Sequence, residues 1–199
     1  MSEVVIIDSG GANIASLLIA FERLQTKAVL TSDADIIRNA NRVLLPGVGA
    51  AKDAMTRLRD SRLIDVIRDL KQPVLGICLG MQLLCEGSEE EDVECLGVIP
   101  GTAKKLPPEP DHAVPNMGWC STRFMREHRA FAGIDDGSYF YYLHSYALPV
   151  TRNTLATARH AEEFSAIVGH ENFVAAQFHP ERSSAAGAQL LQNFIGTQP

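Results

Sequence analysis

Apolar residues occur along the chain in two alternating patterns: short continuous runs, and longer stretches in which they recur every three or four positions. The continuous runs are rich in Val, Ile and Leu, as expected of strands buried on both faces of a sheet. The periodic stretches are typical of helices with one apolar face. Strands are predicted at residues 3–7, 27–31, 42–45 and 73–77. Helices are predicted at residues 13–25, 33–39, 50–60, 61–71 and 79–86, with Asn13 as the N-cap of the first.

The second half of the chain has a different pattern. An acidic stretch at residues 87–94 predicts a solvated loop, and the prolines of residues 100–118 favour irregular extended chain. Closely spaced strands follow, the last two joined by Glu171-Asn172, which is short enough for a hairpin. These strands are predicted at residues 138–148, 154–160, 164–170 and 173–178, before a helix at residues 185–195. The predicted fold class is α/β, with a mostly parallel central sheet, helices on both faces and antiparallel C-terminal strands.

Composition narrows the class of protein. The 199 residues predict a single domain over residues 1–199, and 46% hydrophobic with 21% charged residues is ordinary for a globular chain. A formal net charge of −6 argues against nucleic acid as a partner. No apolar run reaches the roughly 20 residues of a membrane helix, and the start of the chain has no basic segment typical of a signal peptide. The four cysteines form no Cys-x-x-Cys pair, so we expect reduced thiols in a cytoplasmic protein, without zinc.

The sharpest local motif is Gly76-Ile77-Cys78-Leu79-Gly80, between an apolar strand and a predicted helix. A Gly-x-nucleophile-x-Gly sequence in that context is typical of a nucleophile elbow, here with Cys in place of Ser. The start of a helix favours a thiolate, and the N–H of Leu79 is placed to hold an oxyanion. A buried structural cysteine in a glycine-rich turn is the alternative.

A thiolate used in acyl transfer needs a base, and His179 ends the last predicted strand. Glu181 lies two residues on, and extended chain would put both side chains on one side. Glu181 could then orient one imidazole nitrogen while the other faces the sulfur. The alternative is a strand-end histidine held by its neighbour. Both Cys78 and His179 are expected at carboxyl ends of strands, where α/β proteins bind ligands.

Two further segments are candidates for the same site. Gly47-Val48-Gly49 follows the third predicted strand and could present backbone N–H groups to an oxyanion. It mimics a dinucleotide fingerprint only in part, because Lys52 replaces the last glycine and the strand is not the first. His144, in the predicted strand at residues 138–148, could line the site as well.

Taken together, Gly76 to Gln82 and the run Gln177-Phe178-His179-Pro180-Glu181 resemble the class I glutamine amidotransferases. Further motifs are similar to those of the glutaminase subunits of imidazole glycerol phosphate synthases. These motifs are Asp8-x-Gly10-x-x-Asn13, Pro46-Gly47-Val48-Gly49, Pro115-Asn116-Met117-Gly118-Trp119 and Tyr139-Phe140-x-x-x-His144-Ser145-Tyr146. They span nearly the whole chain, in order.

The resemblance implies a reaction and a site. Cys78 would attack the carboxamide of L-glutamine and form a thioester, His179 would protonate the departing ammonia and then activate water, and Glu181 would orient His179. No cofactor or metal is implied. The remaining implied residues are Leu79, Gly47, Val48 and Gly49 for the oxyanion, Gln82, Ser145 and Tyr146 for glutamine, and Asn13, Trp119 and Arg182 at a partner interface. The implied partner is a cyclase subunit with a TIM-barrel fold, which receives the ammonia in a heterodimer that serves histidine biosynthesis.

Other interpretations stay open on the sequence. The chain could be the glutaminase subunit of another synthase, a non-catalytic binding subunit with the same fold, or an unrelated cysteine hydrolase. Two positions also depart from the motif Pro-His-x-Gly-Trp-Asn usual in the resembled subunits, since Asn116 replaces His and Cys120 replaces Asn.

Overall fold

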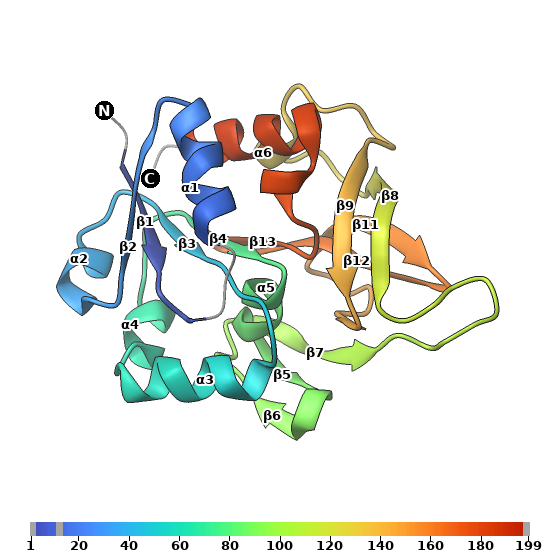
Figure 1. The fold of residues 1–199 in the computed structure, drawn as a ribbon, viewed down its shortest axis with the longest axis horizontal. Helices are drawn as coiled ribbons and strands as arrows, with labels where there is room; N and C mark the ends of the chain where they lie inside the picture. Colours follow the sequence, from blue (N-terminus) through green and yellow to red (C-terminus); the bar gives the residue numbers. More distant parts are fainter. Residues whose placement is uncertain (1–2, 11–13, 197–199) are drawn as a thin grey trace.

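The computed structural model describes residues 3–10 and 14–196, and these build a nine-stranded sheet ordered β2-β1-β3-β4-β13-β12-β11-β8-β9 (Figure 1). Its strands are β1 (Glu3–Ile7), β2 (Lys27–Thr31), β3 (Val43–Leu45), β4 (Val74–Ile77), β8 (Asn116–Phe124), β9 (Tyr139–His144), β11 (Thr154–His160), β12 (Glu162–His170) and β13 (Phe173–Ala176). The pairs from β2 to β13 are parallel, and those from β13 to β9 are antiparallel. The predicted fold class is confirmed.

Helices cover both faces of the parallel half. Figure 1 shows α1 and α6 on one face and α3, α4 and α5 on the other. The helices are α1 (Ile14–Arg23), α2 (Ala34–Arg38), α3 (Ala51–Asp60), α4 (Ile64–Arg68), α5 (Leu79–Leu84) and α6 (Ser184–Gly196). Single 3₁₀ turns are η1 (Glu90–Asp92), η2 (Arg129–Phe131) and η3 (Pro180–Arg182). Among the helices of the described ranges, none is long and apolar enough to cross a membrane.

The side-chain alternation of β1 divides the interior into two cores. Val5 and Ile7 pack into the cluster that contains α3, α4 and α5, whereas Val4 and Ile6 pack into the cluster with α1 and α6. Successive residues of a strand point to opposite faces, so a continuous apolar run is needed where both faces are covered. The apolar runs of the sequence therefore have a direct packing explanation.

A smaller sheet corrects three predictions. It pairs β10 (Tyr146–Ala147), β7 (Ile99–Lys105), β5 (Cys85–Ser88) and β6 (Val93–Glu94). The predicted helix at 79–86 ends at Leu84, the predicted loop at 87–94 contains β6, and the predicted irregular segment at 100–118 contains most of β7. Short strands of this kind are stabilised by their tertiary pairing, which local propensity does not report.

Pro100 fits within β7 because the ladder is irregular there. Cys85 is opposite Ile99 and Gly87 is opposite Thr102, so β7 has one more residue than β5 across this step. Pro100 and Gly101 occupy the resulting bulge, and Gly101 has a φ of +116°. The extra residue of a bulge is unpaired, so the missing N–H of proline costs no hydrogen bond of the ladder there, and glycine is common at such positions. Proline therefore marks a bulge in this segment and not the absence of a strand.

The strand predicted at 138–148 is two strands in different sheets. It leaves the large sheet after β9, passes through Ser145, and enters the small sheet as β10, where Tyr146 pairs with Lys105. All of β8 lies outside the predicted strands, because its sequence mixes glycine, polar and exposed apolar positions. The hairpin through Glu171-Asn172 is confirmed, with His170 opposite Phe173. The proposed N-cap Asn13 lies outside the described residues.

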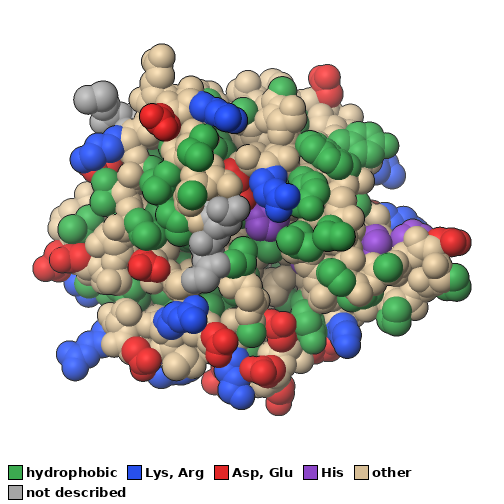
Figure 2. Space-filling model, in the orientation of Figure 1, with side chains coloured by type: hydrophobic (Ala, Val, Ile, Leu, Met, Phe, Trp, Pro, Cys, Tyr) green, Lys and Arg blue, Asp and Glu red, His purple; other side chains and the backbone are tan. Residues whose placement is uncertain are grey.

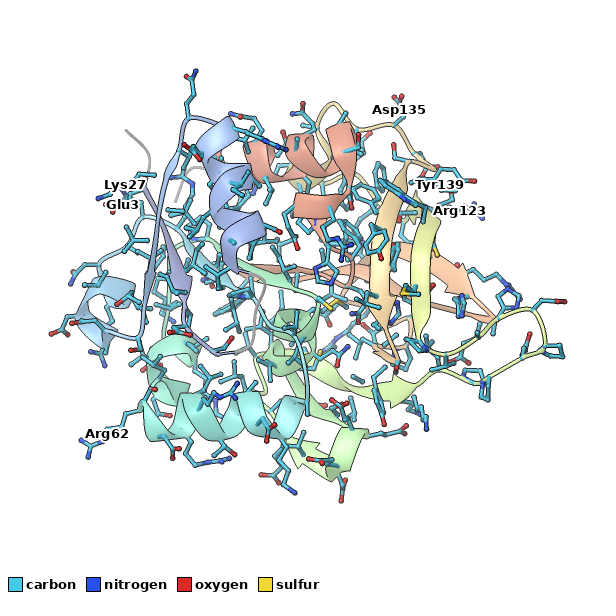
Figure 3. All side chains as sticks on the ribbon, in the orientation of Figure 1. Glu3, Lys27, Arg62, Arg123, Asp135 and Tyr139 are labelled. Atoms are coloured by element: carbon cyan, nitrogen blue, oxygen red, sulfur yellow. The ribbon has the colours of Figure 1, made fainter. Side chains whose placement is uncertain are left out.

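Exposed charges lie at the periphery of this architecture. Glu3 and Lys27 are directly opposite on β1 and β2, and their side chains form an ion pair of 3.0 Å. Figure 3 shows this pair at the opposite end of the molecule from Tyr139 and Arg123. Exposed pairs contribute only about 0–1 kcal/mol, so burial in the two cores is the main stabilising contribution.

Candidate active site

Two neighbouring parallel strands end together and bring Cys78 to His179. In the register of β4 and β13, Ile77 is opposite Ala176, and the Cys78 N–H donates to the Ala176 carbonyl at 2.8 Å. The chain then continues into α5 from one strand and toward His179 from the other. Both residues are 6% exposed and line the same cavity. Cys78 and His179 therefore lie at the carboxyl ends of neighbouring parallel strands, as expected from the sequence.

The turn at Cys78 has the strained backbone expected of an elbow. Cys78 has a φ of +53° and a ψ of −111°, a conformation that L residues rarely adopt. Gly80 lies so close to β3 that a Cβ atom there would overlap the Leu45 carbonyl oxygen. A Cβ on Gly76 would come to 2.8 Å from Leu84 Cδ1. The two glycines are thus required by close packing on either side of the sulfur.

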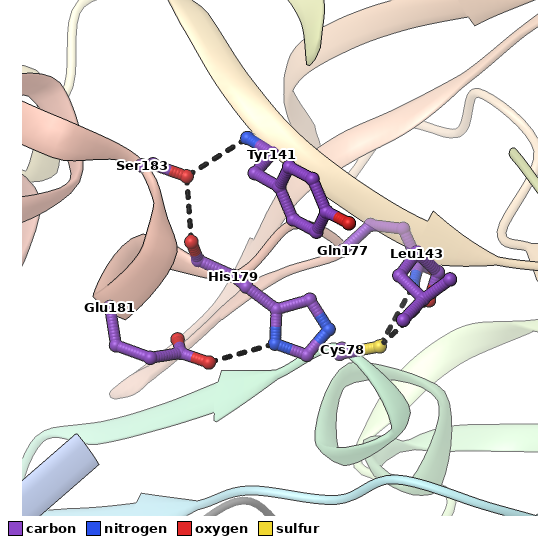
Figure 4. Close-up of polar contacts among 7 residues, drawn as sticks. All are labelled: Cys78, Tyr141, Leu143, Gln177, His179, Glu181 and Ser183. Atoms are coloured by element: carbon purple, nitrogen blue, oxygen red, sulfur yellow. Dashed lines mark hydrogen bonds and ion pairs between the residues drawn. The ribbon is translucent and has the colours of Figure 1, made fainter. Parts of the chain in front are cut away.

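His179 is oriented by Glu181 through a 3₁₀ turn and not through extended chain. His179 Nδ1 lies 2.9 Å from Glu181 Oε1, and Figure 4 shows the other ring nitrogen on the side of the Cys78 sulfur. Ser183 Oγ donates to the His179 carbonyl at 2.6 Å and accepts from the Tyr141 N–H at 2.9 Å. The contact predicted between His179 and Glu181 is present, but the reason given for it was wrong.

Gly187 fixes this turn from behind. A Cβ atom on Gly187 of α6 would overlap the Pro180 carbonyl oxygen, so the helix backbone packs directly on η3. The Gly187 N–H also donates to the Ser183 carbonyl at 3.0 Å. The position of Glu181 is therefore set by main chain on both sides.

The pKa of His179 is raised to about 10. Burial alone lowers it, because a buried imidazolium loses hydration, but the Cys78 sulfur and the Glu181 carboxylate outweigh that effect. An imidazole that is protonated at neutral pH beside a sulfur nucleophile is placed to act as a general acid.

The cavity at this edge has a volume of about 240 Å³, enough for an amino-acid-sized molecule. Its lining contains most residues of the predicted site. Gly47 is not among them; it packs behind the site, where a Cβ would come to 2.9 Å from Leu79 Cβ. The lining residues predicted from the sequence are Cys78, His179, Leu79, Val48, Gly49, Gln82, Ser145, Tyr146 and His144.

Two residues in and beside this cavity were missed by the sequence analysis. Glu90 lines it, and its carboxylate accepts a 3.0 Å hydrogen bond from the Ala51 N–H at the start of α3. Gln177 is fully buried, and its Nε2 lies 3.9 Å from Cys78 Sγ. Nothing distinguishes Glu90 from its acidic neighbours in the sequence. Gln177 could have been identified as a site residue, because it lies two positions before the proposed base His179.

The residues predicted at a partner interface lie on a neighbouring face. Trp119 is 51% exposed and packs edge-on against Tyr141, with ring centroids 6.1 Å apart. The Arg182 guanidinium carbon is 4.2 Å from the centre of the same Tyr141 ring. Figure 2 shows hydrophobic side chains gathered over β8 and β9 on this side. Asn13 lies outside the described residues.

Comparison with known proteins agrees with this geometry. The family description "Glutamine amidotransferase class-I" matches residues 5–197. The fold is similar to that of a crystal structure of a glutamine amidotransferase, with a TM-score of 0.74 and 16% identity over 98% of this chain and 99% of that one. A putative GMP synthase protein from Thermoplasma acidophilum has a TM-score of 0.72 and 21% identity, covering 98% and 93% of the two chains. The chain belongs to the class I glutamine amidotransferases.

Relatives of similar sequence show to which family of class I glutamine amidotransferases the chain belongs. The imidazole glycerol phosphate synthase subunit HisH of Xanthomonas axonopodis pv. citri (strain 306) is 47% identical over 195 residues, which cover 98% of each chain. The subunit HisH 2 of Legionella pneumophila (strain Lens) is also 47% identical, with the same coverage. Within its class, the chain therefore falls in the HisH family.

We expect Glu181→Gln to lower the pKa of His179, because an amide replaces one of the two groups that raise it. A raised folded-state pKa stabilises the fold below the unfolded value near 6.5, and the stabilisation is lost as pH rises toward 10. The variant should therefore lose stability at neutral pH and show a weaker loss above it. Titration of the His179 ring by NMR, with urea unfolding at several pH values, measures both effects. An unchanged His179 titration contradicts the assignment.

Proposed function

We propose that this chain is the glutaminase subunit of an imidazole glycerol phosphate synthase, and that residues 1–199 act as one glutamine amidotransferase domain. It hydrolyses L-glutamine to glutamate and ammonia and passes the ammonia to a cyclase subunit in histidine biosynthesis. The observation that carries the proposal is that Cys78 and His179 line one cavity of amino-acid size, with Glu181 bonded to the far nitrogen of the imidazole. The 47% identity to HisH subunits supports the choice of synthase.

The proposed reaction has two halves. The Cys78 sulfur attacks the carboxamide carbon of glutamine, and the resulting oxyanion collapses to a thioester as His179 gives its proton to the leaving nitrogen. Ammonia leaves, and neutral His179 then takes a proton from the water that attacks the thioester. Glutamate is released, and the sulfur and the imidazolium are restored. Glu181 keeps Nδ1 of His179 occupied, so that Nε2 carries both proton transfers.

Backbone N–H groups are the proposed oxyanion donors. Leu79 begins α5, and within the described residues its N–H donates to no backbone carbonyl, as expected of a first-turn residue. Val48 and Gly49 line the same cavity. Gly47 supports the loop from behind by packing on Leu79. A tetrahedral intermediate on Cys78 would then lie between these two segments.

The polar wall of the cavity suits the amino-acid end of glutamine. Glu90 offers a carboxylate to the α-ammonium group, and Ser145 and Tyr146 provide backbone and side-chain polar groups on the other side. Gln82 Nε2 already donates to the Tyr146 carbonyl at 2.9 Å, so we assign Gln82 mainly to holding this wall.

The proposed partner is the cyclase subunit, which has a TIM-barrel fold and docks on the face with Trp119 and Arg182. An exposed tryptophan beside an arginine stacked on tyrosine is typical of an interface anchor. The four free cysteines support a cytoplasmic location for the heterodimer.

The test is glutamate release by the purified chain, alone and with the cyclase subunit of the same organism and its nucleotide ligand. We expect low activity alone and strong stimulation in the complex. Trp119→Ala should weaken association at least about tenfold, because hot-spot aromatics contribute about 2 kcal/mol or more. Complementation of a histidine auxotroph that lacks its glutaminase subunit is the cellular counterpart.

Arg123→Ala is the matched surface control on the same strand, and should leave association and stimulation unchanged. Stimulation by an anthranilate synthase partner in place of the cyclase would overturn the choice of synthase. Absence of glutamate release in every mixture would overturn the glutaminase function itself.

A further inference from the structure

A buried histidine outside the proposed triad lies in the wall of the cavity. His144 is the last residue of β9 and is 6% exposed. It is directly opposite Asn116 in the pairing of β8 with β9, and their side chains meet, with Asn116 Nδ2 3.0 Å from His144 Nε2. On the other side of the ring, His144 Nδ1 lies 3.0 Å from the Tyr146 carbonyl oxygen.

These two contacts fix the tautomer. A carbonyl oxygen only accepts, so Nδ1 must carry the proton that bonds to Tyr146. A neutral ring then has a bare Nε2, which accepts from the Asn116 amide. The Asn116 Oδ1 is left to accept from the Cys120 thiol, whose sulfur lies 3.6 Å away. Burial raises the pKa of Cys120, which keeps this thiol protonated and able to donate.

The surroundings of His144 favour the neutral ring. The pKa of His144 is lowered to about 4, mainly by burial; the hydrogen bond to the Tyr146 carbonyl opposes this effect, and the neighbouring His160 and His179 add to the lowering. The rings of Tyr142 and Phe164 pack on the imidazole, and burial raises the pKa of the Tyr142 phenol, so that it stays uncharged. The other titratable residues that line the cavity are Cys78, Glu90, Tyr146 and His179.

The same carbonyl continues the chain of contacts toward the nucleophile. Gln82 Nε2 donates to the Tyr146 carbonyl at 2.9 Å and to Gln177 Oε1 at 3.2 Å. Gln177 Nε2 in turn lies 3.9 Å from Cys78 Sγ. The Tyr146 carbonyl therefore has two donors, one from His144 and one from Gln82.

We propose that His144 is a positioning residue for the glutamine site. Asn116 keeps its imidazole neutral and in one tautomer, and the ring holds the Tyr146 carbonyl against the wall of the cavity. Gln82 and Gln177 are aligned by that carbonyl, and they direct an amide donor at the sulfur. The consequence for catalysis rests on the proposed glutaminase function, whereas the tautomer and its contacts stand without it.

The first test replaces the ring. His144→Leu removes both hydrogen bonds, and we expect kcat/KM for glutamine in the complex to fall by about 10- to 100-fold, because small displacements at an active site have effects of that size. His144→Gln can donate to Tyr146 and accept from Asn116, and should stay within about threefold of the parent. Equal kcat/KM for His144→Leu and the parent, both measured well below their melting temperatures, overturns the proposal.

The second test replaces the hydrogen-bond donor that Asn116 presents to His144 by an acceptor. In Asn116→Asp a carboxylate replaces the amide donor, so Nε2 must carry a proton and His144 becomes an imidazolium that titrates at about pH 6 to 8. We expect an added inflection in the pH profile of glutamine hydrolysis, with loss on the alkaline side, because a ring that gives up one proton keeps the one facing the carboxylate and no longer donates to the Tyr146 carbonyl. The side chain that His144→Gln introduces does not titrate. The inflection should therefore vanish in the double variant Asn116→Asp with His144→Gln.

The chain offers a matched control for this exchange. Asn153 Nδ2 lies 3.3 Å from His170 Nδ1, an equivalent pair outside the cavity. Asn153→Asp should leave the pH profile of hydrolysis unchanged. A His144 ring that stays neutral by NMR in Asn116→Asp, or an inflection that persists in the double variant, overturns the proposal.

A failure of the glutaminase function would be distinguishable from a failure of this inference. If the parent releases no glutamate, the NMR titration of His144 still decides its tautomer. The rate of Cys78 alkylation by iodoacetamide then replaces hydrolysis as the functional readout. We expect its pH profile to change in His144→Leu and to be kept in His144→Gln; a change in neither variant would count against the positioning of the sulfur.

Discussion

Cys78→Ala is expected to lower glutamine hydrolysis by at least about 1,000-fold, because it removes the atom that forms the thioester. The fold should remain, since alanine fits the space and the strained φ of +53° is tolerated as poorly by cysteine as by alanine. Glutamate release measured in the complex, with the melting temperature of each protein, separates chemistry from stability.

The chain provides a cysteine control for that experiment. Cys95 is buried in the small sheet region, and burial raises its pKa to about 11, so it is an unreactive thiol at neutral pH. Cys95→Ala should retain hydrolysis, and iodoacetamide should still inactivate it. Hydrolysis that survives Cys78→Ala at a level above about one tenth of the parent would remove Cys78 from the mechanism.

Gly80→Ala is expected to have the largest effect on stability, about 3 kcal/mol, because the new methyl group would overlap the Leu45 carbonyl oxygen and neither backbone can move freely. The displacement would also shift α5 and the elbow, so activity should fall in the folded fraction too. Urea unfolding and the kcat of the variant measure the two effects.

Gly196→Ala, at the end of α6, is the matched control. A Cβ there meets no atom of the described residues within 4 Å, and we expect stability to change by less than about 0.5 kcal/mol. A Gly80→Ala protein as stable as this control would show that the contact with β3 is looser than the geometry indicates.

Features that depend on local sequence were predictable. The apolar runs that became β1, β3 and β4, the elbow at Cys78 and the ending of β13 before His179 each have a signature within a few residues. The parallel arrangement then follows from connection rules, and with it the meeting of Cys78 with His179 at one edge.

Features that depend on distant pairing were not predictable. β6 and the second half of β5 look like a solvated loop in sequence, because β5 is held by its pairing with β7, and β6 by its pairing with β5. The place of Glu90 in the cavity follows from that same small sheet. The tautomer of His144 required Asn116, which lies 28 positions away in the sequence. Such contacts exist only once the chain has folded.

Gly80 and Gly187 together determine how the site will fail on heating. Each allows one backbone to rest on another, beneath the sulfur in one case and behind the Glu181 turn in the other. Contacts between main chains cannot relax by side-chain rotation, so the active site cannot loosen while the rest of the fold stays intact. A temperature scan should therefore show enzymatic turnover and circular dichroism disappearing in a single shared transition, with no warm, folded but inactive intermediate before it.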